Sequence, residues 1–189
     1  YSPSLPALTR DLMISAAVAE YTISVSLCAF SLGMLFWGRV SDGYGRKPCI
    51  LVGLTMHLIG CIGCYYAGSI EWLMASKFVQ SFGATAGNVL GLVMLRDVYH
   101  GKELSRICAL VVSALGVAPA IGPTIGGFIA QKYGWQYNFL FLSGAGLLVM
   151  LLIFFLLPET LPVTERRSVG LYPLMLRMIG DRQAMAGVF

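Results

Sequence analysis

The chain alternates between long apolar runs and short polar segments. A helix needs about 20 mostly apolar residues to cross a bilayer. Five runs approach or exceed this length with at most one charged residue each: 21–38, 48–70, 72–95, 107–131 and 133–158. We therefore expect transmembrane helices at about residues 18–40, 48–70, 72–96, 106–131 and 135–157. The predicted fold class is all-α, a polytopic membrane protein.

The composition agrees with a membrane protein. The mean hydropathy is +0.76 and 12% of the residues are charged, whereas soluble domains carry about a quarter. The sequence contains no phosphate-binding glycine loop, metal-ligand cluster or nucleophile triad, so we expect no enzyme, cofactor or metal site. Cys61 and Cys64 form a CxxC, which elsewhere indicates redox or metal chemistry. Within an apolar run we interpret both as small hydrophobic side chains.

The positive charges predict the orientation. Lys and Arg resist translocation, so the loops that carry more of them stay in the cytoplasm. The segments 38–48, 96–106 and 159–182 lie on one side and hold most of these residues. The opposite loops hold only Arg10 and Lys132. We therefore place segments 38–48 and 159–182 in the cytoplasm.

The segment GRVSDGYGRKP, residues 38–48, concentrates charge in an otherwise apolar chain. We predict a tight cytoplasmic turn, because glycines permit a short turn and close backbone approach. Pro48 suits the first turn of the following helix. Topogenic charge would account for the Lys and Arg residues here, but it does not account for Asp42.

Lys77 lies inside the third apolar run. A Lys in the middle of a membrane costs roughly 2.5 to 3.5 kcal/mol on insertion scales, and such residues usually face a cavity and carry function. Gln80 and Ser81 share its helix face, and Asn88 continues a polar stripe that we expect to face inward. Alternatively, the long side chain of Lys77 reaches the outer interface near Trp72 by snorkelling.

Few titratable groups lie within the apolar runs. Glu20, at the outer end of the first complete helix, is a candidate proton site or only a helix cap. We interpret His57 as a packing or weakly polar residue. Trp37, Trp72 and Trp135 lie near predicted helix ends, as an interfacial belt requires, although the sequence does not separate belt aromatics from pocket aromatics.

Several of these motifs together resemble the major facilitator superfamily. The segment 38–48 is similar to its loop signature G-x-x-x-D-x-x-G-R-R/K, with matches at Gly38, Asp42, Gly45, Arg46 and Lys47. SKFVQSFGATAG resembles the fourth-helix pattern R-x-x-Q-G, with Lys77 in place of Arg, Gln80 matching and Ser81 in place of Gly. APAIGPTIGG resembles the fifth-helix antiporter motif through Gly122, Pro123, Gly126 and Gly127, with Ala118 in place of the first Gly.

The shorter strings LPAL, RDVY, GWQYNF and LPET resemble the bicyclomycin/chloramphenicol-resistance (Bcr/CflA) branch of the drug:proton antiporters. The resemblance implies a twelve-helix carrier, of which residues 1–158 form the N-terminal transmembrane bundle from the end of helix 1 through helix 6. Residues 159–182 would form the cytoplasmic central linker, and 183–189 the start of helix 7. Because residue 1 is Tyr and the last apolar run is unfinished, we expect the C-terminal half of the same protein to follow.

The resemblance also implies roles for the motif residues. Asp42, Arg46 and Asp97 would form a cytoplasmic conformational latch together with Gly38, Gly45 and Lys47; the alternative is a solvated turn. The substrate or proton cavity would include Lys77, Gln80, Ser81, Asn88 and Glu20. The family's usual membrane acid lies in helix 1, and we expect that part of helix 1 to precede residue 1.

The implied function is proton-driven efflux of small amphipathic drugs by alternating access, in an integral membrane protein of a bacterial inner membrane. Its partners would be the drug, protons, the lipid bilayer and the missing half, with no nucleic acid and no cofactor. Two alternatives stay open. One is an exporter of a small metabolite with the same fold, and the other is a membrane scaffold that transports nothing.

Overall fold

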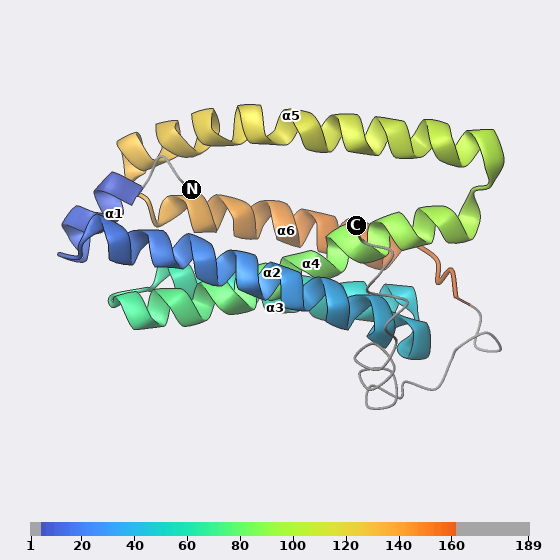
Figure 1. Cartoon of the computed structure of the whole chain (residues 1–189), viewed down its shortest axis with the longest axis horizontal. Coiled ribbons are helices and arrows are strands. Elements are labelled where there is room, and N and C mark those ends of the chain that lie inside the picture. The colour runs from blue at the N-terminus through green and yellow to red at the C-terminus, as the bar shows by residue number, and fades with distance from the viewer. Residues whose placement is uncertain (1–4, 162–189) are drawn as a thin grey trace, which may run out of the picture.

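The computed structural model describes residues 5–161, and the helices lie side by side along one long axis (Figure 1). A short helix opens this part of the chain, and five longer ones follow. Each of the five is long and apolar enough to cross a membrane. Their bounds are α1 Leu5–Asp11, α2 Ala16–Tyr44, α3 Arg46–Tyr65, α4 Ile70–Val98, α5 Gly101–Tyr133 and α6 Tyr137–Leu156. Most of the predicted linker, and the predicted start of the next helix at 183–189, lie outside the described residues.

The connection between α2 and α3 is shorter than the sequence suggested. We expected a turn over residues 38–48, but α2 continues through Tyr44 and α3 begins at Arg46. Gly45 alone separates them, and its φ of 103° lies in a region that side-chain-bearing residues rarely adopt. Because glycine adopts positive φ without steric cost, one residue suffices to reverse the chain, and Asp42 becomes a helical residue.

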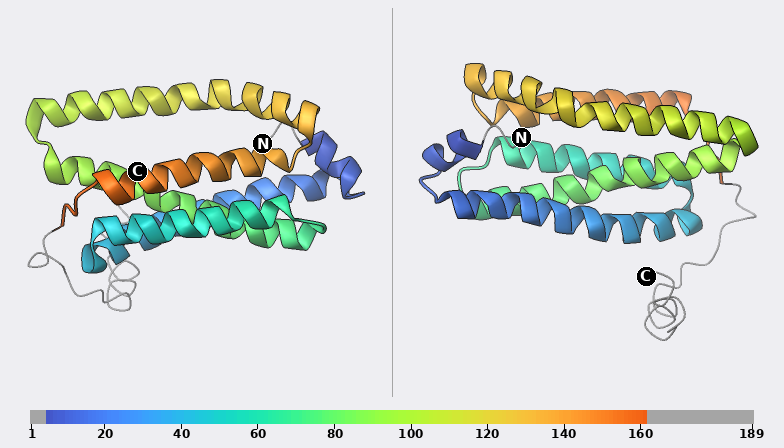
Figure 2. Two further views of the ribbon diagram at one scale, coloured as in Figure 1. Left: turned by 180° about the vertical axis from the view of Figure 1, so that it is seen from behind. Right: turned by 45° about the horizontal axis from the view of Figure 1, so that its top comes forward.

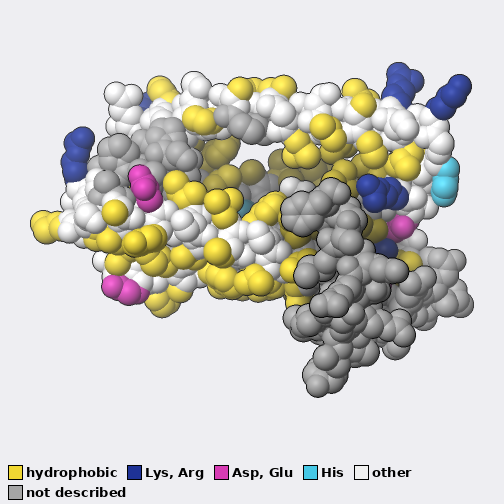
Figure 3. Space-filling view, in the orientation of Figure 1, with side chains coloured by type: hydrophobic (Ala, Val, Ile, Leu, Met, Phe, Trp, Pro, Cys, Tyr) yellow, Lys and Arg dark blue, Asp and Glu magenta, His cyan; other side chains and the backbone are white. Residues whose placement is uncertain are grey.

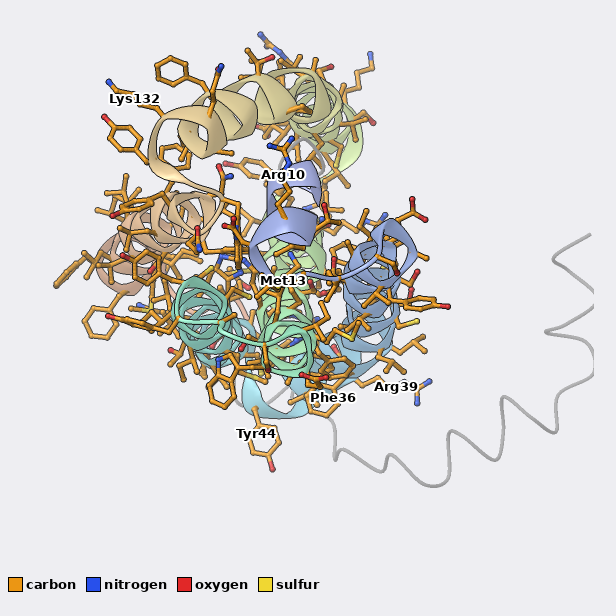
Figure 4. The ribbon with its side chains drawn as sticks, turned by 90° about the vertical axis from the view of Figure 1, so that its left-hand side faces the viewer. Arg10, Met13, Phe36, Arg39, Tyr44 and Lys132 are labelled. Carbon is orange, nitrogen blue, oxygen red and sulfur yellow. The ribbon has the colours of Figure 1, made fainter. Side chains whose placement is uncertain are left out.

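The helices α2, α3 and α4 form the packed part of the molecule. Seen end-on, α4 lies between α2 and α3, and α6 lies beside α3 (Figure 4). One buried cluster near the α3–α4 turn includes Leu73 and Trp135, and a second near the α2–α3 turn includes Trp37 and Leu90. Trp37 and Trp135 are 3% and 1% exposed, so both belong to the core. The sequence left open whether these aromatic residues form an interfacial belt or face a pocket, and the structure places both rings between helices.

Glycines set the distance between α3 and α4. A Cβ at Gly60 would lie 2.5 Å from Gln80 Cα, and one at Gly83 would lie 2.5 Å from the His57 backbone nitrogen. Gly53 lies equally close to α4. Small residues let membrane helices approach until their backbones touch. The two helices are therefore joined backbone to backbone across the middle of the bundle.

The helix α5 has a different environment. Figure 2 shows it joined to the bundle through its two ends, and Figure 3 shows an open gap between its middle and the helices opposite. A Cβ at Gly116 or Gly122 would meet nothing within 4 Å. Within the described residues, α5 therefore contributes little to the packed core.

The five long helices alternate in direction. The α2–α3 and α4–α5 connections lie at one end of the molecule, and the α3–α4 and α5–α6 connections lie at the other (Figure 1). Lys and Arg side chains gather where α4 joins α5 (Figure 3). This is the end that the positive charges of the sequence assign to the cytoplasm.

Candidate functional site

A group of charged side chains lies where α2, α3 and α4 meet, and we call it the Arg46 cluster. The Arg46 Nη1 atom lies 2.6 Å from Asp42 Oδ1 and 2.6 Å from Ser41 Oγ. Its Nε atom lies 3.2 Å from Asp97 Oδ2. One guanidinium thus binds two carboxylates, one from α2 and one from the last turns of α4.

The local fold explains this arrangement. Arg46 follows Asp42 by four positions, and the single-residue turn at Gly45 brings the first residue of α3 back over the last turn of α2. The Arg46 side chain is 9% exposed, whereas those of Asp42 and Asp97 are 48% and 26% exposed. A buried guanidinium needs its charge balanced, and here the balance comes from acids that reach water.

The other motif residues of this segment have distinct positions. Gly38 is half-buried, with Val89 as the nearest neighbour of a Cβ placed there. Lys47 points toward α6 and donates from Nζ to the Phe154 carbonyl oxygen at 2.9 Å. The side chain of Arg39 projects away from the bundle (Figure 4). Two neighbouring positive residues of the motif therefore act on different helices, with Arg46 bound to α2 and α4 and Lys47 bound to α6.

A second polar group lies inside the bundle around Lys77, and we call it the Lys77 network. Lys77 is 8% exposed. Its Nζ donates to Gln80 Oε1 at 3.0 Å and lies 5.3 Å from the centre of the Phe139 ring. The amino group therefore lies against α4 and α6, in contrast to the snorkelling alternative, in which it would extend to the outer interface.

Gln80 carries the network across to α3. Its Nε2 donates to Cys61 Sγ at 3.1 Å, and Cys61 Sγ lies 3.5 Å from His57 Nε2. His57 Nδ1 lies 3.2 Å from the Gln80 backbone oxygen. Both side-chain ends of Gln80 are thus occupied, one by Lys77 and the other by Cys61.

Cys61 and His57 belong to this network, and sequence reasoning had given neither a site role. The usable signal was their spacing of four residues, which places them on one helix face. The sequence could not show that this face of α3 contacts Gln80 on α4. That contact depends on the close approach of α3 and α4 at Gly60.

A cavity adjoins the Lys77 network between α3 and α6. Its volume is about 330 Å³, and Cys61 and Phe139 line it together with Tyr65, Tyr66 and Ser143. The lining is mostly apolar and aromatic with a few polar groups, and Tyr66 is 75% exposed, so the cavity opens to the surface of the bundle.

The structure does not bring every predicted cavity residue to Lys77. Ser81 is half-buried and its carbonyl accepts the Thr85 hydroxyl at 2.9 Å. Asn88 is exposed, so the expected inward stripe does not extend to it, because the packed face of α4 continues instead through Ala86 and Leu90. Glu20 is exposed near the start of α2 and makes no hydrogen bond or ion pair with the residues described.

The fifth-helix motif lies along the second half of α5. Gly122 and Pro123 are exposed, and Gly126 is buried. Ala118 lies in the same helix. In the part of the chain that the structure describes, no group of three or more His, Cys, Asp or Glu side chains is placed to hold a metal ion.

Comparisons with known proteins identify relatives that match most of the chain. A family model described as Major Facilitator Superfamily matches residues 1–183. An uncharacterized transporter of Rickettsia bellii is 37% identical over 179 residues, which is 95% of this chain and 44% of the relative. A bicyclomycin resistance protein homolog of Haemophilus influenzae is 33% identical over 95% of this chain and 44% of the relative.

Further relatives extend the comparison to multidrug resistance proteins and to a solved structure. Multidrug resistance protein MdtL of Klebsiella pneumoniae is 32% identical over 89% of this chain and 43% of the relative. The crystal structure of the human organic anion transporter MFSD10 (TETRAN) superposes with a TM-score of 0.61 at 22% identity, over 86% of this chain and 38% of that chain. The chain thus spans less than half the length of these relatives. Its helical architecture and its match to the family model agree, and the chain belongs to the Major Facilitator Superfamily.

Proposed function

We propose that this chain forms the N-terminal half of a secondary transporter that exports small amphipathic drugs across a bacterial cytoplasmic membrane in exchange for protons. Two relatives are named for bicyclomycin and multidrug resistance, which supports a drug as the substrate. The single observation that carries the proposal is the buried Lys77, whose amino group is held by Gln80 beside an aromatic cavity.

Lys77 supports a transporter rather than a passive scaffold, because placing a lysine within a membrane costs free energy. A lysine at membrane depth costs roughly 2.5 to 3.5 kcal/mol, and a scaffold helix could use leucine at this position without that cost. Lys77 is kept here with a hydrogen-bond acceptor and an aromatic ring in place. Intramembrane ionisable groups usually lie on substrate or ion pathways, so we assign Lys77 and Gln80 to the transport pathway.

The Arg46 cluster supplies a conformational latch in this mechanism. Its ion pairs join α2, α3 and α4 at the cytoplasmic end. The Asp42 and Asp97 carboxylates reach water, so water solvates them when the ion pairs break and the two halves of the transporter rock. We assign the glycine motif of α5 to the contact with the C-terminal half, because Gly122 has open space in front of it and Pro123 is exposed.

The test is drug export by the complete transporter in everted membrane vesicles, with chloramphenicol and bicyclomycin as probes. We expect export by the wild type to collapse on addition of a protonophore. Lys77→Ala should reduce the export rate by about tenfold or more, equivalent to about 1.4 kcal/mol, and Lys77→Arg should retain part of it. The matched control is Lys102→Ala, since Lys102 is an exposed lysine in the first turn of α5.

Each other outcome has a definite meaning. Export that survives the protonophore would contradict proton coupling. Wild-type vesicles that move neither probe would point to a metabolite as the substrate. Full activity of Lys77→Ala would remove Lys77 from the transport pathway and reduce it to a packing residue.

A further inference from the structure

Two helix ends lie side by side next to the Arg46 cluster, and each is capped by a charged residue from the other segment. Glu159, three residues beyond the end of α6, reaches the start of α3. Its Oε1 accepts the Arg46 backbone N–H at 2.9 Å, and its Oε2 accepts the Lys47 backbone N–H at 3.3 Å. The residue that precedes α3 is Gly45, which offers no side-chain cap of its own.

The reciprocal cap comes from Lys47. Its Nζ donates to the carbonyl oxygen of Phe154 in the last turn of α6 at 2.9 Å, and lies 5.8 Å from the centre of the Phe154 ring. The first N–H groups and the last carbonyls of a helix have no partner within that helix. Negative charge is favoured at the N-terminal end of a helix, and positive charge is favoured at its C-terminal end. Glu159 and Lys47 satisfy both ends with the matching signs.

Glu159 also organises the chain on its own side. Its Oε1 accepts the Leu161 N–H at 3.1 Å, in addition to that of Arg46. One carboxylate therefore accepts three backbone N–H groups from two segments. The Glu159 carboxylate therefore holds the turn that follows α6 and the first residue of α3 next to each other.

Arg46 connects this capping pair to the cluster. Its backbone N–H binds Glu159, while its side chain binds Asp42 on α2 and Asp97 on α4. The direction in which the guanidinium leaves α3 depends on how the first residue of that helix is held. Three helices and the segment that leaves α6 thus meet at a single residue, and Glu159 holds its backbone.

We propose that Glu159 is a positioning residue for the Arg46 cluster, which couples the segment leaving α6 to the ion pairs that join α2, α3 and α4. Removal of Glu159 frees the first turn of α3, so Arg46 loses the geometry that joins α2 and α4. The transport readout of this proposal rests on the proposed function, whereas the structural readout does not. The Glu159 of the string LPET therefore acts on a motif more than a hundred residues earlier in the sequence.

The chain contains a reporter for this state. Cys49 lies in the first turn of α3 and is 4% exposed, and Cys64 lies near the other end of the same helix and is fully buried. N-ethylmaleimide reacts with a cysteine only when water and the reagent reach it. The alkylation rates of Cys49 and Cys64, read by mass spectrometry in the complete transporter, therefore separate local opening at the cluster from a general loss of packing.

The variants are Glu159→Ala and Glu159→Gln, with Glu103→Ala as the matched control. Glu103 is an exposed acid in the first turn of α5 at the same end of the molecule. We expect Glu159→Ala to raise the Cys49 alkylation rate about fivefold or more, the scale expected for a lost helix cap, with Cys64 unchanged. Glu159→Gln keeps an acceptor oxygen but loses the charge, so its Cys49 rate should be intermediate. Glu103→Ala should match the wild type.

Three results would overturn the proposal. They are a wild-type Cys49 rate in Glu159→Ala, an equal rise at Cys49 and Cys64, and a rise of the same size in Glu103→Ala. If the Glu159→Ala variant fails to accumulate in the membrane, the Cys49 and Cys64 alkylation rates of Glu159→Gln are compared with those of the wild type and of Glu103→Ala instead. In vesicles, Glu159→Ala should lower the maximal export rate more than the apparent affinity for the drug. A wild type that exports neither probe would contradict the proposed function, while the Cys49 rates would still decide the role of Glu159.

Discussion

The interface between α3 and α4 and the free face of α5 are built from similar residues but have opposite environments. Both carry several glycines. At Gly60 and Gly83 the space that a side chain would need is filled by the partner backbone, whereas at Gly116 and Gly122 it is empty within 4 Å. A stripe of small residues therefore indicates that another helix can approach closely. It does not indicate which helix does so.

This difference should separate effects on stability from effects on transport within this chain. The closed interface is occupied by this chain itself, so changes there should alter folding. The open face has no partner among residues 5–161, so changes there should leave the folding of this half intact. The three predictions below test this separation.

The largest effect is expected for Gly60→Ala. The added methyl group would collide with the backbone of Gln80, which has no flexible end that could move aside. Overpacking of this kind costs about 1 to 3 kcal/mol, and it should also displace Gln80 from Cys61. Thermal unfolding in detergent measures the loss. Gly144→Ala, at a helical glycine of α6 with open space in front of it, is the control and should unfold near the wild-type temperature.

A smaller effect is expected for Trp37→Phe. Trp37 Nε1 donates to the Phe82 carbonyl at 2.9 Å across α2 and α4, and the residue is 3% exposed. Loss of the bond and of part of the ring should cost about 1 to 2 kcal/mol. Trp72→Phe removes a similar bond, from Nε1 to the Gly63 carbonyl at 3.0 Å, at a residue that is 57% exposed. Equal losses in the two variants would show that burial of the indole ring is not what matters.

The smallest effect on stability is expected for Gly116→Ala and Gly122→Ala. Neither methyl group meets an atom within 4 Å, and alanine is the better helix former by about 1 kcal/mol. Unfolding temperatures should stay the same or rise slightly, while drug export by the complete transporter should fall if this face contacts the other half. A marked drop in the unfolding temperature would mean that α5 is packed more tightly than the structure indicates.

The sequence predicted the architecture better than the site. Apolar run length was enough to identify the five long helices, because crossing a bilayer imposes a minimum length that few other requirements produce. Helix ends were less accurate. The expected turn over 38–48 is helical except at Gly45, because a single glycine at positive φ performs a reversal that we assigned to a longer segment.

Contacts between distant segments could not be obtained from local patterns. The motif indicated that Asp42, Arg46 and Asp97 belong together. In the structure, the Arg46 guanidinium lies 2.6 Å from the Asp42 carboxylate and 3.2 Å from the Asp97 carboxylate. No comparable pattern indicated that Glu159 caps α3 or that Cys61 and His57 meet Gln80. Both contacts depend on how α3 packs against its neighbours, which spacing along one helix does not reveal.

The single residue between α2 and α3 also bears on how the protein is made. With only Gly45 between them, the two helices have no slack with which to enter the bilayer one after the other. We expect them to insert as a hairpin, with the turn on the side where synthesis takes place, because its charged residues resist translocation. A lengthened connection would give each helix its own insertion step, and with it an opportunity to adopt the wrong orientation.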